Sequence, residues 1–107
     1  MQPTLPRVAV VGGTPNRWRQ ALNGLDVQVV GSSRDGGTRR VSSLVRSITA
    51  GSFVAVVICT RWLAHSDTDR VRRACQASGT RLVLSDGGRQ QLRVIVLRLL
   101  RGASDVH

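Results

Sequence analysis

The sequence lacks several residue types on which common protein chemistries depend. Its 107 residues include no lysine, no glutamate and no tyrosine. Without lysine there is no Walker-type phosphate loop, and neither the GxSxG nor the HExxH signature is present. Two cysteines, Cys59 and Cys75, are too few for a disulfide scaffold or a zinc site, so we expect two buried thiols. No complete catalytic site is recognisable, and the sequence predicts no metal and no cofactor.

Long apolar segments are also missing. No apolar run approaches the roughly 20 residues needed to span a bilayer, and residues 1–6 do not have the basic-then-apolar pattern of a signal peptide. We therefore expect a cytoplasmic protein without a membrane partner.

The charge of the chain is strongly one-sided. Sixteen basic residues, all arginine, stand against six acids, all aspartate, for a formal charge of +10 and a pI near 11.9. Such a field attracts polyanions, and guanidinium groups bind phosphate bidentately. The alternative is a solvated surface whose arginines reflect only the codon bias of a GC-rich genome. The composition favours nucleic acid as the partner, and we expect DNA rather than RNA.

Apolar periods of two and of 3.6 residues alternate along the chain, which predicts alternating strands and helices. We expect strands at residues 7–11, 26–30, 53–59 and 81–84, and helices at residues 16–25, 38–50, 66–78 and 89–101. This pattern is typical of a small doubly wound, Rossmann-like or flavodoxin-like α/β fold with a parallel sheet ordered 2-1-3-4. Residues 1–107 form one domain in this prediction, with an ordered core at 6–101 and a frayed tail at 102–107.

In a sheet of this order, the loops after the first and third strands meet at a crevice where ligands bind. Paired glycines let a backbone approach phosphate closely, and helix N-termini offer unpaired N–H groups to it. Ser66 has the character of a helix N-cap. The predicted phosphate-binding residues are Gly12, Gly13, Thr14, Asn16, Thr60, Arg61 and Ser66. If the crevice is catalytic, His65 and Asp86 are the candidate acid and base; the alternative is a structural histidine.

Arginine and tryptophan are neighbours in two segments, and aromatic faces in nucleic-acid binders stack on bases. Trp18 has the spacing of a core residue with Leu22, which is our preferred interpretation. Trp62 lies in a predicted loop and is the better candidate for stacking. The predicted nucleic-acid-binding residues are Arg17, Arg19, Arg39, Arg40, Arg61, Trp62, Arg70, Arg72 and Arg73.

Several of these segments resemble a bacterial family catalogued as domain of unknown function 2325. The similar segments are residues 8–13, 57–60, 64–66, 71–72 and 85–88, together with Cys75 and Gly79. Members of that family have a strand ending in Gly-Gly and a Ser-His pair before a basic helix; here Ala64 stands in place of the serine. The resemblance implies the same fold and the same crevice.

Three functions remain open. The first is a DNA-binding accessory protein without enzymatic activity. The second is binding or hydrolysis of a nucleotide or cyclic oligonucleotide in the crevice of Gly12, Gly13 and His65. The third is a structural interaction module whose positive charge serves an acidic protein partner. The last helix has a core-facing apolar stripe of Leu92, Ile95, Val96, Leu99 and Leu100. Val94 and Leu97 fall outside that stripe, which predicts a homo-oligomer that associates through this helix.

Overall fold

The computed structural model describes residues 7–12, 15–31, 38–59, 65–85 and 88–104. Strands and helices alternate along the chain, as the apolar periods predict. The strands are β1 (Val8–Val11), β2 (Val27–Val30), β3 (Ala55–Cys59) and β4 (Arg81–Ser85), and the helices are α1 (Pro15–Ala21), α2 (Thr38–Thr49), α3 (His65–Ser78) and α4 (Arg89–Ser104).

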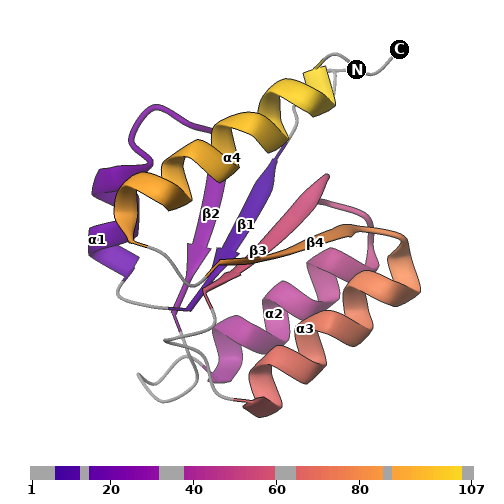
Figure 1. Cartoon of the computed structure of the whole chain (residues 1–107). Helices are drawn as coiled ribbons and strands as arrows, with labels where there is room; N and C mark the ends of the chain where they lie inside the picture. The colour runs from indigo at the N-terminus through magenta and orange to yellow at the C-terminus, as the bar shows by residue number, and fades with distance from the viewer. Residues whose placement is uncertain (1–6, 13–14, 32–37, 60–64, 86–87, 105–107) are drawn as a thin grey trace.

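The four strands form one parallel sheet in the order β2-β1-β3-β4, which confirms the predicted fold class. Helices α1 and α4 cover one face of the sheet and α2 and α3 cover the other (Figure 1). Strands β1 and β3 lie in the middle and are buried along their whole length. Apolar residues on both faces explain why these two strands have continuous rather than alternating hydrophobic sequences.

The core has two halves, one on each face of the sheet. On the α2–α3 side, Val41, Leu44 and Ile48 of α2 pack against alternate residues of β1 and β3. On the α1–α4 side, Leu92 and Val96 of α4 pack against the other residues of the same strands. The predicted stripe of α4 is confirmed, because its five members all belong to this second half of the core.

Some predicted boundaries are wrong. Helix α1 ends at Ala21 rather than at residue 25, because short turn hydrogen bonds and Gly24, with a φ of 83°, replace the helical pattern there. Phe53 is buried but precedes β3. Helix α4 continues to Ser104 through Gly102, where a tail was predicted; a helical glycine costs only about 1 kcal/mol relative to alanine.

None of the described helices is long and apolar enough to cross a membrane.

Candidate nucleic-acid interface

The predicted crevice has the topology that the sequence indicates. Strands β1 and β3 are neighbours, and the helices that follow them cover opposite faces of the sheet. Many of the residues predicted for the crevice or for nucleic-acid binding lie outside the described residues, either entirely or in their side chains. These are Gly13, Thr14, Thr60, Arg61, Trp62 and Asp86, and the side chains of Asn16, Arg17, Arg39, Arg40 and His65.

Gly12 closes β1 at the edge of this crevice. Its φ of 101° lies in the left-handed region that favours glycine. Its N–H donates to the carbonyl of Val30 at 2.9 Å, and its own carbonyl accepts a hydrogen bond from Trp18 Nε1 at 2.7 Å. Both backbone groups are therefore used inside the protein, so Gly12 shapes the bend without offering its N–H to a phosphate.

Trp18 is a buried core residue, as its spacing with Leu22 predicts. Its ring packs in the α1–α4 half of the core, and its indole N–H reaches the end of β1. The hydrogen bond fastens α1 to the sheet at the place where the chain leaves β1. The ring is therefore not exposed for stacking on a base.

The start of α3 differs from the prediction. The helix begins at His65, so Ser66 lies in the first turn and is not the N-cap; it is exposed to solvent. Asp67 is only 2% exposed. Sequence reasoning missed this burial, although the spacing of Asp67 with Val71 and Ala74, four and seven residues later, places it on the buried face of the helix.

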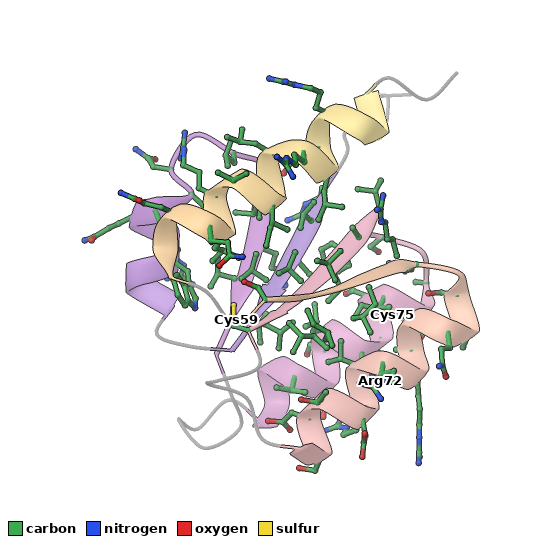
Figure 2. The ribbon with its side chains drawn as sticks, viewed as in Figure 1. Cys59, Arg72 and Cys75 are labelled. Atoms are coloured by element: carbon green, nitrogen blue, oxygen red, sulfur yellow. The ribbon has the colours of Figure 1, made fainter. Side chains whose placement is uncertain are left out.

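The three predicted arginines of α3 are not equivalent. Arg70 is half-buried, and its Nη2 donates to Ser42 Oγ of α2 at 2.8 Å. Arg72 and Arg73 are exposed, and Figure 2 labels Arg72 on α3. Of the three, Arg72 and Arg73 can bind an external phosphate without breaking a hydrogen bond between helices.

Helix α4 carries basic residues that sequence reasoning missed, because it assigned only apolar residues of this helix to a function. Arg93, Arg98 and Arg101 are exposed, and α4 contains no acidic residue. Arg93 Nη1 donates to the carbonyl of Ala21 at 2.7 Å, so it also stabilises the end of α1. The sequence signal for Arg93, Arg98 and Arg101 is that they fall outside the apolar stripe of a helix that contains no acidic residue.

A pocket of about 530 Å³ opens beside α4 at the amino ends of β3 and β4, opposite the predicted crevice. Arg81 of β4 and Arg98 of α4 both line it, together with the apolar residues Phe53, Val54 and Leu99. We call the set Arg81, Arg93, Arg98 and Arg101 the α4 basic surface. Two of its four members, Arg81 and Arg98, come from different segments of the chain and line this pocket.

The two thiols are buried, as predicted. Cys59 ends β3 and Cys75 lies on α3, and both are unpaired cysteines (Figure 2). Burial raises the pKa of Cys59 to about 12 and raises the pKa of Cys75 as well. Neither thiol supplies a thiolate nucleophile near neutral pH. Across the described part of the chain, no three histidine, cysteine or acidic side chains gather as a metal site would require.

The chain matches no protein-family model, and no curated protein matches it at a significant level. The resemblance to domain of unknown function 2325 therefore stays a prediction. The candidate interface is supported by its own geometry and charge alone.

Proposed function

We propose that the protein is a nucleic-acid-binding accessory protein that contacts the phosphates of duplex DNA through its arginines. One observation carries the proposal: within the described part of the chain, few arginines have a described carboxylate partner. Among the described residues, the single arginine–carboxylate ion pair joins Arg7 Nε to Asp26 Oδ1 at 3.5 Å. Arg70 and Arg93 each donate hydrogen bonding inside the protein, to Ser42 and to the carbonyl of Ala21. The remaining donors of the described guanidinium groups can bind external anions, and phosphate accepts two of them at once.

The α4 basic surface is the principal contact in this proposal. Helix α3 contains Asp67 and Asp69, whereas α1, α2 and α4 contain no acid, so the α1–α4 side repels phosphate less than the α2–α3 side. Arg93 and Arg101 are separated by about 12 Å along the helix axis, close to the roughly 12 Å width of the major groove. A helix with this spacing can contact the phosphates on both sides of one groove.

Binding of this kind depends on salt and little on base sequence, because phosphates are the same at every step. The proposal includes a homo-oligomer, since two copies would align two basic surfaces along one duplex and gain avidity. The α3 pair Arg72 and Arg73 would then extend the contact.

Fluorescence anisotropy at several salt concentrations tests the proposal with labelled duplex DNA, single-stranded DNA and RNA. The double substitution Arg98→Gln with Arg101→Gln removes two phosphate contacts and should lower the salt slope by about 1.8. Between roughly 50 and 200 mM salt, the variant should therefore lose about 12-fold less affinity than the wild type.

The matched variant Arg72→Gln with Arg73→Gln removes the same charge from α3 and should change the slope less. Equal changes in both variants would remove the preference for α4. No binding to any nucleic acid at low salt would end the proposal. Thermal stabilisation by mononucleotides or cyclic oligonucleotides in that case would support the nucleotide site predicted at the crevice.

A further inference from the structure

The two edges of the sheet are unlike one another. Strand β2 forms one edge, and none of its side chains is fully exposed. Strand β4 forms the other, and Leu84 near its end is 52% exposed, the most exposed of the large apolar residues described. Among the described strands, β4 pairs with β3 alone. An open edge with exposed leucine is a template for pairing with a further strand.

The sequence of β4 is nearly symmetric about its centre. Leu82 and Leu84 flank Val83, with Arg81 and Ser85 outside them. In an antiparallel pair of two β4 strands centred on Val83, Leu84 of each copy lies directly opposite Leu82 of the other. Both leucines belong to the α2–α3 face, because they pair with Val56 and Ile58, which belong to that half of the core. Each exposed Leu84 would thus gain an apolar neighbour on the same face.

Charge is compatible with this register. Arg81 of each copy lies opposite Ser85 of the other, so the two Arg81 side chains are four residues, roughly 13 Å, apart along the paired strands. The other apolar surface, Val94 and Leu97 on α4, is 47% and 38% exposed but is surrounded by Arg93, Arg98 and Arg101. Because α4 has no acid, a symmetric α4 contact would place like charges together.

We infer that two copies of the chain associate through their β4 edges, with a two-fold axis at Val83, to form one continuous eight-stranded sheet. The inference rests on the homo-oligomer of the proposed function and moves its interface from α4, where the sequence places it, to the sheet edge. Strand order within the dimer becomes 2-1-3-4-4-3-1-2. The antiparallel join makes this a mixed sheet, which is common.

Disulfide trapping tests the register. At the two-fold axis, the Cβ atoms of the two Val83 residues lie about 5 Å apart, whereas two Leu84 residues are diagonal neighbours at about 7–8 Å. Val83→Cys should therefore form a covalent dimer under mild oxidation at least tenfold faster than Leu84→Cys. The wild type is the background control, because Cys59 and Cys75 are both buried. Equal trapping rates in the two variants would overturn the register.

Sedimentation tests the interface without new cysteines. In about 0.5 M salt, where repulsion between the basic copies is screened, the wild type should be dimeric at roughly 100 µM. Leu84→Lys should weaken the dimer at least tenfold, because an edge lysine opposes strand pairing. Val94→Lys, with the same gain of charge on an equally exposed apolar residue, should leave it unchanged.

A monomeric wild type overturns the inference. Dissociation by Val94→Lys with an intact dimer in Leu84→Lys overturns it too and returns the interface to α4. DNA binding is scored separately: a wild type that dimerises but binds no nucleic acid ends the proposed function and leaves the β4 interface standing.

Discussion

Stability at high pH depends on the two buried thiols, because this chain has neither lysine nor tyrosine. Arginine stays protonated and the α-amino group titrates near pH 8, so between about pH 9 and pH 12 the two cysteines are the side chains that titrate. An unfolded thiol ionises near its ordinary pKa of 9.0, whereas burial raises the pKa of Cys59 to about 12. Its contribution to stability is complete below pH 9 and is lost as the pH rises toward 12.

The size of the effect follows from the two pKa values. At about pH 11, which is two units above the pKa of the unfolded thiol, that thiol is ionised, while Cys59 in the native state is still mostly protonated. The contribution of Cys59 to the free energy of unfolding therefore falls by roughly 2–3 kcal/mol. For a domain of this size, that corresponds to a melting temperature lower by on the order of 10–20 °C. Cys75 acts in the same direction, since burial raises its pKa as well.

Urea unfolding between pH 8 and about pH 11, in a phosphine reductant, measures this loss. Cys59→Ala should begin less stable, because it leaves a small cavity, yet its stability should fall less with pH by roughly the same 2–3 kcal/mol. Cys75→Ala is the matched control. Its free energy of unfolding should still fall with pH by the amount that Cys59 contributes. If the wild type and Cys59→Ala lose equal stability, the thiol is not the titrating group and the reasoning is wrong.

Three substitutions address the crevice. Trp18→Phe should destabilise the fold by about 1–3 kcal/mol, because it leaves the buried carbonyl of Gly12 without its indole donor; unchanged urea stability would contradict that role. Trp62→Ala should weaken binding to single strands more than to duplex if the ring stacks on bases; equal effects in anisotropy would indicate packing. His65→Ala should retain the native circular dichroism spectrum and DNA binding, while abolishing mononucleotide binding if the crevice is a nucleotide site; an unfolded variant would make His65 structural.

The order of elements and of strands could be predicted from the sequence, because both depend on local patterns. Apolar periods separate helices from strands, and right-handed crossovers leave few arrangements for four alternating pairs. The outward positions of Val94 and Leu97 on α4 could be predicted for the same reason, since helical spacing alone assigns each residue to a face. The net charge likewise depends only on composition, and it predicts a polyanion as the partner.

The tertiary structure decided which polar side chains already have hydrogen-bond partners inside the protein. Arg70 bonds to Ser42 and Arg93 to the carbonyl of Ala21, across 28 and 72 residues of sequence. No local pattern distinguishes these two from Arg98, because a hydrogen-bond partner distant in sequence is brought near only when the layers pack. The predicted strand order already places β4 at an edge of the sheet, but the exposure of Leu84 there depends on how the helices pack over that face and is known only from the structure.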